Sequence, residues 1–179
     1  MDLRGMFAPS SVAVVGATDR EGSVGRAILE NLEPFGGEVI PVNPNRESVL
    51  GMDCVASLSE AGGVDLAVVV VPASVAVSVV EEAGESGVEN VVVVSAGFSE
   101  AGSEGATRER ELRAAAEEHG INLVGPNCLG VMSTPADLNA TFGPTIALDG
   151  SVSFMSQSGA FVTAVLDWAT DEGIGFKDV

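Results

Sequence analysis

Short apolar segments that end at glycine or proline constrain the fold of this chain most strongly. Five of them cover residues 11–15, 38–42, 66–71, 90–95 and 121–124. Between them lie segments with helical character, at 24–32, 74–86 and 107–119, and a shorter helical turn near 57–61. Because the strands are apolar on both faces, they suit a parallel sheet that helices cover on both sides. The pattern predicts an α/β fold with a Rossmann-type, doubly wound parallel sheet, which binds ligands at the carboxyl ends of its strands.

The chain changes character after residue 131. Residues 132–149 hold prolines and a glycine and predict one short strand, at 139–142. A strand at 151–155, a turn and a helix at 160–171 follow. One strand–helix unit cannot bury its own apolar face. We therefore expect a first domain at residues 1–145 and, at 146–179, the first βα unit of a second domain, truncated from a longer protein.

The charge of the chain is strongly acidic, with 26 Asp and Glu against 8 Lys and Arg and a net charge of −18. Such a balance argues against nucleic-acid binding through a basic face. With Lys177 as the one lysine, it favours a salt-adapted source, where salt screens self-repulsion. An acidic mesophilic protein is the alternative. No apolar run has the length of a membrane span, and the N-terminus lacks a signal-peptide pattern, so we expect a cytoplasmic protein without membrane contact.

A glycine-rich loop joins the first strand to the first helix. Gly16 permits a tight turn, Gly22 permits close approach of a ligand, and Gly25 permits close packing of the helix on the strand. The helix start that follows offers backbone N–H groups and the positive end of a dipole to a phosphate. The loop indicates a nucleotide-phosphate site, although a tight turn without a ligand remains the alternative.

The tip of the second strand distinguishes between nucleotides. NAD sites usually place Asp or Glu there to hold the ribose hydroxyls. Here the tip reads Asn43-Pro44-Asn45-Arg46, and Arg46 suits a phosphate on the ribose. NADP and CoA both carry one. A solvated loop cation is an equally good interpretation of Arg46 from the sequence alone.

Six motifs in one order resemble a known family. They are Gly16-Ala17-Thr18 with Gly22-Ser23-Val24-Gly25, Pro41-Val42-Asn43-Pro44, Val70-Val71-Pro72-Ala73, Ser95-Ala96-Gly97-Phe98-Ser99-Glu100, Gly125-Pro126-Asn127-Cys128-Leu129-Gly130 and Ser156-Gln157-Ser158-Gly159. Together they resemble the CoA-binding domain of nucleoside-diphosphate-forming acyl-CoA synthetases. The ADP-forming acetate–CoA ligases are the most similar type, and succinyl-CoA synthetase α subunits are more distant. The resemblance covers the whole chain and implies that the second domain, which begins at residue 146, is flavodoxin-like.

The resemblance implies a CoA site made by these loops. The phosphates would lie on Gly16, Ala17, Thr18, Gly22, Ser23, Val24 and Gly25, and the adenosine end on Asn43, Asn45 and Arg46. Val71, Pro72 and Ala73 would line the adenine and pantetheine path. Ser95, Ala96, Gly97, Phe98, Pro126, Asn127 and Cys128 would guide the pantetheine arm. For Cys128 we favour a structural or pocket-lining role over that of a nucleophile, because no histidine lies near it in sequence.

The turn Ser156, Gln157, Ser158 and Gly159 opens a helix and suits a phosphoryl group. In the family this helix start faces a phosphohistidine, whereas an ordinary helix cap is the alternative interpretation. The one histidine, His119, ends a polar helix and matches no family motif, since the family's catalytic histidine lies beyond residue 179. The ATP-grasp part is also absent. We therefore expect CoA binding and no catalytic residue within these 179 residues.

In the parent enzyme, the resemblance implies that acyl-CoA, ADP and phosphate give the acid, CoA and ATP. ADP or ATP and Mg would bind only to the missing parts. The partners would be the remaining domains or a β subunit, in an oligomer, and we expect no metal site within this chain. Two other hypotheses stay open: a CoA-sensing module, for example fused to an acetyltransferase, and an NADP-binding oxidoreductase domain.

Overall fold

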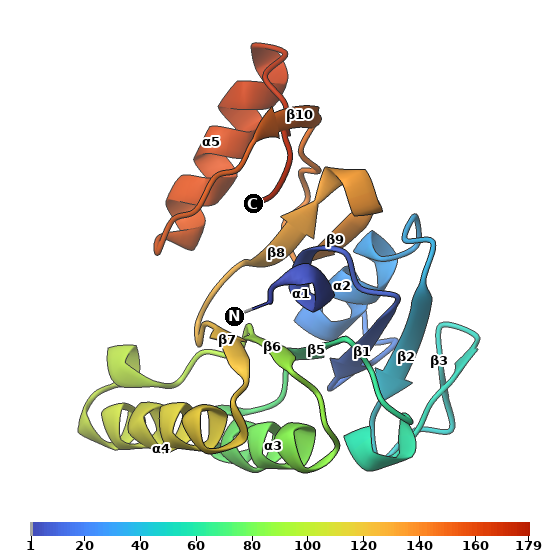
Figure 1. Cartoon of the computed structure of the whole chain (residues 1–179), viewed down its shortest axis with the longest axis vertical. Coiled ribbons are helices and arrows are strands. Elements are labelled where there is room, and N and C mark those ends of the chain that lie inside the picture. The colour runs from blue at the N-terminus through green and yellow to red at the C-terminus, as the bar shows by residue number, and fades with distance from the viewer. Residues whose placement is uncertain (1) are drawn as a thin grey trace.

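A computed structural model describes residues 2–179 and contains the expected parallel sheet (Figure 1). Its strands are β1 (Ser11–Val15), β2 (Glu38–Val42), β5 (Leu66–Val69), β6 (Asn90–Val93) and β7 (Asn122–Val124). They pair in parallel in the order β2-β1-β5-β6-β7. The strand order reverses between β1 and β5, where doubly wound sheets bind ligands. The predicted fold class is confirmed.

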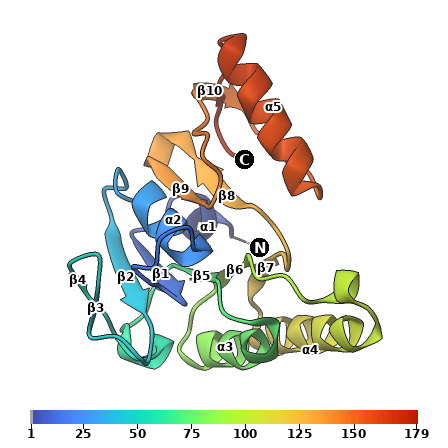
Figure 2. The same ribbon diagram turned by 180° about the vertical axis from the view of Figure 1, so that it is seen from behind.

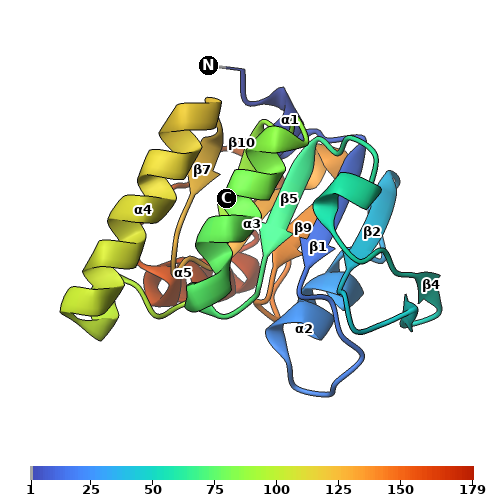
Figure 3. The ribbon, with the colours of Figure 1, turned by 90° about the horizontal axis from the view of Figure 1, so that it is seen from below.

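Helices cover both faces of the sheet. The main helices are α2 (Val24–Asn31), α3 (Ala73–Glu85) and α4 (Ser103–His119), and α1 (Arg4–Phe7) is a single turn. Figure 3 shows α3 and α4 side by side on one face of the sheet. The opposite face carries α1, α2 and an antiparallel hairpin of β8 (Gly130–Ser133) and β9 (Leu138–Thr141).

The two cores use alternate residues of the same strands. Ala13 and Val15 face the core under α3 and α4, whereas Val12 and Val14 face the core under α2. The later strands alternate in the same way, because successive side chains of a strand point to opposite faces. Burial on both faces therefore explains why β1, β5 and β6 are mostly Val, Ala and Leu.

Several boundaries differ from the sequence-based expectation. Helix α3 begins at Ala73 with Pro72 as its N-cap, so Ser74 is not the cap. Pro72 lies just before the first helical residue, where its missing N–H costs no helical hydrogen bond, and its carbonyl accepts from the N–H groups of Val75 and Ala76. Helix α4 begins at Ser103, four residues earlier than expected, after Gly102 at a φ of +106°.

Other short elements went unpredicted. They include strand β8 and the two-residue strands β3 (Ser48–Val49) and β4 (Met52–Asp53). Three 3₁₀ turns, Leu58–Glu60, Ser99–Ala101 and Thr134–Ala136, complete the short elements, and the first of them lies at the predicted helical turn.

The last thirty residues form a strand, a helix and a returning segment. Strand β10 (Asp149–Val152) begins two residues before the predicted position, and α5 (Gly159–Asp171) follows the predicted turn. The final segment, 176–179, lies between β8 and β10. Met132 and Val179 exchange backbone hydrogen bonds of 2.8 and 2.9 Å, and the N–H of Lys177 donates to Val152 O at 2.8 Å.

This returning segment joins the C-terminal unit to the first domain. Helix α5 packs over it in a small core that includes Leu129, Met132 and Phe176. Figure 2 shows this unit lying beyond the β8–β9 hairpin. Within residues 2–179, no helix is both long and apolar enough to cross a membrane. The domain division at residue 145 stays a prediction.

We predict that Gly25→Ala destabilises the fold, because a Cβ at Gly25 would lie 2.6 Å from the carbonyl oxygen of Gly16. Either the helix or the strand would have to shift, at a cost of about 1–3 kcal/mol. Urea unfolding of the wild-type chain and of Gly25→Ala measures the difference between their unfolding free energies. Gly36→Ala is the matched control, because a Cβ there meets nothing within 4 Å. Equal unfolding free energies for Gly25→Ala and Gly36→Ala would contradict the account.

Candidate nucleotide-binding edge

The glycines of the first loop have backbone conformations and contacts that fit the roles the sequence suggests. Gly16 has a φ of +96°, and its N–H donates to Val42 O at 2.9 Å, which turns the chain off β1 toward β2. Gly25 packs against the Gly16 carbonyl. Gly22 has a φ of +70° with open space where a Cβ would be, so a ligand can approach its backbone.

The side chain of Ser23 caps α2. Its Oγ accepts from the Arg26 N–H at 3.4 Å and donates to Arg20 O at 2.6 Å. The first hydrogen bond within the helix runs from the Ala27 N–H to Ser23 O. The N–H groups of Val24 and Gly25 precede that bond, so neither is used within the helix, and Val24 is exposed.

Asn43 fixes the loop after β2 against the loop after β1. Its Nδ2 donates to Ala17 O at 2.8 Å, and its Oδ1 accepts from the Asn45 N–H at 3.0 Å. Arg46 also pairs with Asp19, with 3.3 Å between Nη1 and Oδ1. Two predicted parts of one site, 16–25 and 43–46, are thus in direct contact.

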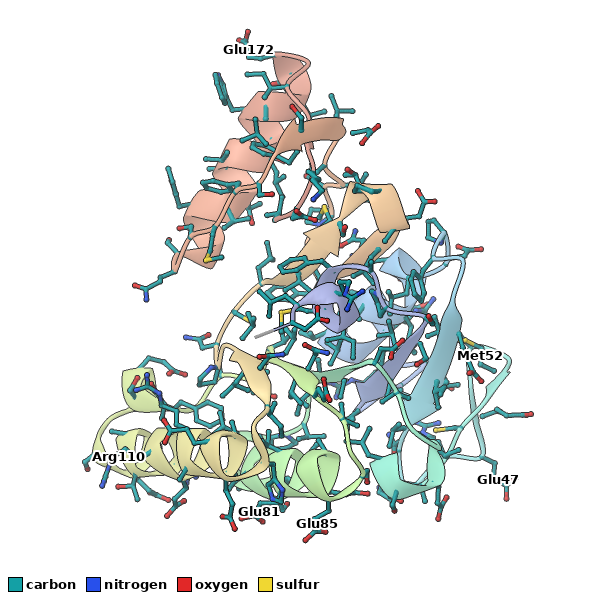
Figure 4. All side chains as sticks on the ribbon, viewed as in Figure 1. Glu47, Met52, Glu81, Glu85, Arg110 and Glu172 are labelled. Carbon is teal, nitrogen blue, oxygen red and sulfur yellow. The ribbon has the colours of Figure 1, made fainter. Side chains whose placement is uncertain are left out.

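Three arginines lie in the segments beside this contact. Arg20, Arg26 and Arg46 are three of the eight basic residues, although the net charge is −18. Arg26 pairs with Glu30 at 2.6 Å and donates to Asp19 O at 2.9 Å, so its guanidinium is already engaged. Elsewhere the rim is acidic, and Figure 4 shows Glu81, Glu85 and Glu172 projecting from the outer surface. The first loop itself carries Asp19 and Glu21 beside Arg20, so cationic and acidic side chains are mixed at this contact.

The loops after β5, β6 and β7 are tied to one another. Ser95 Oγ donates to Val71 O at 2.5 Å, and the Asn127 N–H donates to Ser95 O at 3.0 Å. A Cβ at Gly97 would lie 3.0 Å from the Cβ of Ala73. Pro72, Ala96 and Asn127 are exposed on this edge. The structure therefore brings together the segments that the resemblance assigns to the pantetheine path.

The Phe98 side chain lies apart from this edge. It is fully buried in the core beneath α3 and α4, so only its backbone lies at the loop. The Glu100 carboxylate accepts from the N–H groups of Gly97 (2.5 Å) and Phe98 (3.1 Å). These bonds, the first above all, hold the pKa of Glu100 below its usual value. Glu100 thus shapes the loop, and this role was not apparent from the sequence.

Both cysteines are free thiols. Burial raises the pKa of Cys128 to about 11, and its Sγ donates to Val93 O at 3.4 Å. Burial also raises the pKa of Cys54. A thiol with a raised pKa carries little nucleophilic thiolate at neutral pH. Cys128 is therefore suited to line this edge of the sheet and is not suited to act as a nucleophile.

The second predicted anion site lies beside the first domain. Ser158 caps α5, with its Oγ accepting from the Phe161 N–H at 3.3 Å, and Ser156 Oγ accepts from the Ser158 N–H at 3.1 Å. A Cβ at Gly159 would lie 3.8 Å from the Cβ of Leu129, the residue after Cys128. The start of α5 is therefore next to the loop that follows β7.

Two open hollows lie on other parts of the surface. Hollows of about 380 and 370 Å³ open beside α1 and at the amino ends of the strands, lined by residues that include Arg4 and Lys177 in one and Asp65 and Glu89 in the other. We place the site at the open carboxyl edge because the glycines, the helix start and Arg46 meet there. In residues 2–179, no group of three or more His, Cys, Asp or Glu side chains is arranged to hold a metal ion.

Comparison with known proteins identifies relatives of this chain. It is 50% identical to the ADP-forming acetate–CoA ligase I of Archaeoglobus fulgidus over 97% of its length, which is 26% of that protein. It is 43% identical to the α subunit of ADP-forming acetate–CoA ligase II of Pyrococcus furiosus, over 96% of this chain and 38% of that subunit. The chain therefore spans about a quarter to two fifths of the length of these relatives.

A solved structure has the same fold. The dinucleotide-forming acetyl-coenzyme A synthetase 1 of Ca. Korarchaeum cryptofilum, in complex with phosphate and ADP, superposes with a TM-score of 0.93 at 39% identity, over 99% of this chain and 38% of that one.

Two family models match the chain. Residues 149–179 match the succinyl-CoA ligase like flavodoxin domain. Residues 10–134 match the CoA binding domain, and that range contains the whole five-stranded sheet and every loop at its carboxyl edge. The chain thus belongs to the family of CoA-binding domains.

Proposed function

We propose that this chain is the CoA-binding portion of an ADP-forming acyl-CoA synthetase of the acetate–CoA ligase type. One observation carries the proposal: five loops that match the family in order converge on one edge of the sheet and contact one another. The relatives named as acetate–CoA ligases align along nearly the whole chain, which supports the same reaction class for the parent protein.

The ligand would lie along this edge from β2 to β7. The backbone of Gly16–Gly25 would hold the diphosphate, and Arg46 the phosphate on the ribose. Pro72, Ala73 and the loop at Ser95–Gly97 would line the pantetheine arm, which would end near Asn127 and Cys128. Backbone donors suit this task, because they bind an anion locally on a protein whose net charge repels it.

The start of α5 would hold the phosphate that attacks the thioester. Its backbone N–H groups and the turn at Ser156–Gly159 lie beside Leu129, next to the proposed end of the pantetheine arm. In this proposal residues 1–145 bind CoA, and residues 146–179 begin a second domain. The chain would position the thioester and the phosphate, while the histidine, ADP and Mg would belong to the rest of the parent.

The parent would contain further domains or a β subunit, in an oligomer. The name of the Pyrococcus furiosus relative, a subunit α, supports this arrangement. The acidic surface supports a salt-rich cytoplasm as the environment, since dissolved ions screen repulsion between carboxylates.

We predict that CoA raises the melting temperature of the chain, because a ligand that binds only the folded state stabilises it. At a hundredfold excess over Kd the gain is about 2.7 kcal/mol. Thermal melts with CoA and with NADPH measure the shift. Ala96→Trp should abolish the CoA effect by filling the exposed edge, whereas Ala114→Trp, exposed on α4 away from the edge, should retain it. A shift with NADPH alone would contradict the proposal and favour the oxidoreductase hypothesis.

We predict that Cys128 is unreactive in the folded chain. A thiol pKa raised from 9.0 to about 11 leaves roughly 100-fold less thiolate at pH 8, so alkylation by iodoacetamide slows by at least that factor. Mass spectrometry of timed samples follows the Cys128 peptide, and urea-unfolded protein supplies the reference rate. Equal rates in the two states would show that Cys128 is an accessible thiol of ordinary pKa and would contradict the prediction.

A further inference from the structure

Arg46, the cation of the proposed ribose-phosphate site, is already paired with an acidic side chain. Arg46 Nη1 lies 3.3 Å from Asp19 Oδ1, and Asp19 belongs to the loop that would hold the diphosphate. The pair thus spans the gap between the loops after β1 and β2. Both side chains are about half exposed, at 44% for Arg46 and 49% for Asp19, so solvent and a ligand can reach them.

The backbones on both sides of the pair are fixed. The carbonyl of Asp19 accepts from Arg26 Nη1 at 2.9 Å. On the other side, the Arg46 N–H donates to Asn43 O at 3.2 Å, within the turn that Asn43 anchors to Ala17. Only the two side chains have to move for the ion pair to open.

We propose that Asp19 is a specificity-determining residue, a built-in competitor that a phosphate monoester must displace from Arg46. This inference rests on the proposed function, because it concerns the same CoA site. A carboxylate carries one negative charge, whereas a phosphate monoester carries between one and a half and two at pH 7. Arg46 therefore binds a singly charged anion little better than it binds the carboxylate of Asp19. It binds a phosphate monoester more strongly than either.

The competition has a measurable consequence. Dephospho-CoA lacks the phosphate on the ribose, so it leaves the Asp19–Arg46 pair closed. CoA opens the pair, and its affinity is reduced by the free energy of that contact. Asp19→Asn keeps the size of the side chain and removes its charge, so it should favour CoA over dephospho-CoA more strongly than the wild type does.

Isothermal titration of the 179-residue chain with CoA and with dephospho-CoA tests the proposal. In Asp19→Asn we expect the ratio of the two affinities to rise about two- to fivefold in favour of CoA, the range typical of an exposed ion pair, because any gain from lost repulsion of the diphosphate is common to both ligands. In Arg46→Gln the ratio should fall toward one. The double variant should match Arg46→Gln alone, because Asp19 acts through Arg46.

Glu47→Gln is the matched control. It removes one negative charge beside Arg46, and Figure 4 shows Glu47 at the outer edge of the molecule. Its affinity ratio should equal that of the wild type. An unchanged ratio in Asp19→Asn, or an equal rise in Glu47→Gln, would overturn the inference and leave CoA binding intact. Wild-type protein that binds neither ligand would instead overturn the proposed function, and this inference with it.

Discussion

The close contact between Gly25 of α2 and the carbonyl of Gly16 is the constraint on which the rest of the edge depends. Because neither residue has a side chain, the helix start lies directly against the end of β1. Bulkier residues there would push α2 away and widen the loop. With the contact in place, the first N–H groups of α2 point toward the edge where the strand order reverses. Asn43 then fixes the neighbouring loop against the same turn.

An acidic protein that binds a polyanion has to supply local attraction against its overall charge. The edge does so with backbone donors and with a group of arginines, of which Arg26 serves mainly to hold the loop and Arg46 lies at the gap between loops. The buried thiol of Cys128 and the loop that Glu100 shapes line this edge, and neither supplies a nucleophile. In these terms the edge is built for binding, which agrees with the membership of the CoA-binding family.

The sequence predicted the fold well because its signals are local and strong. Continuous Val and Ala runs mark strands buried on both faces, and Gly87 and Gly120 follow the ends of α3 and α4 at positive φ. Strand β8 was missed because its pairing depends on β9 and on the distant residues 176–179. Tertiary contacts also decided the burial of Phe98 and the Asp19–Arg46 pair. No spacing rule connects residues on two different loops. The sequence could therefore suggest that Arg46 binds a phosphate, but it could not show that Asp19 pairs with Arg46.

Hydrogen–deuterium exchange with and without CoA tests the central claim, that the carboxyl edge of the sheet is the binding surface. The account predicts slower exchange in residues 16–25, 43–46 and 95–98 when CoA is bound, because the ligand engages their N–H groups and restrains their loops. Residues of α4 that face away from the edge should exchange at unchanged rates. Protection confined to the hollow beside α1, lined by Arg4 and Lys177, would contradict the account and move the site to another face of the molecule.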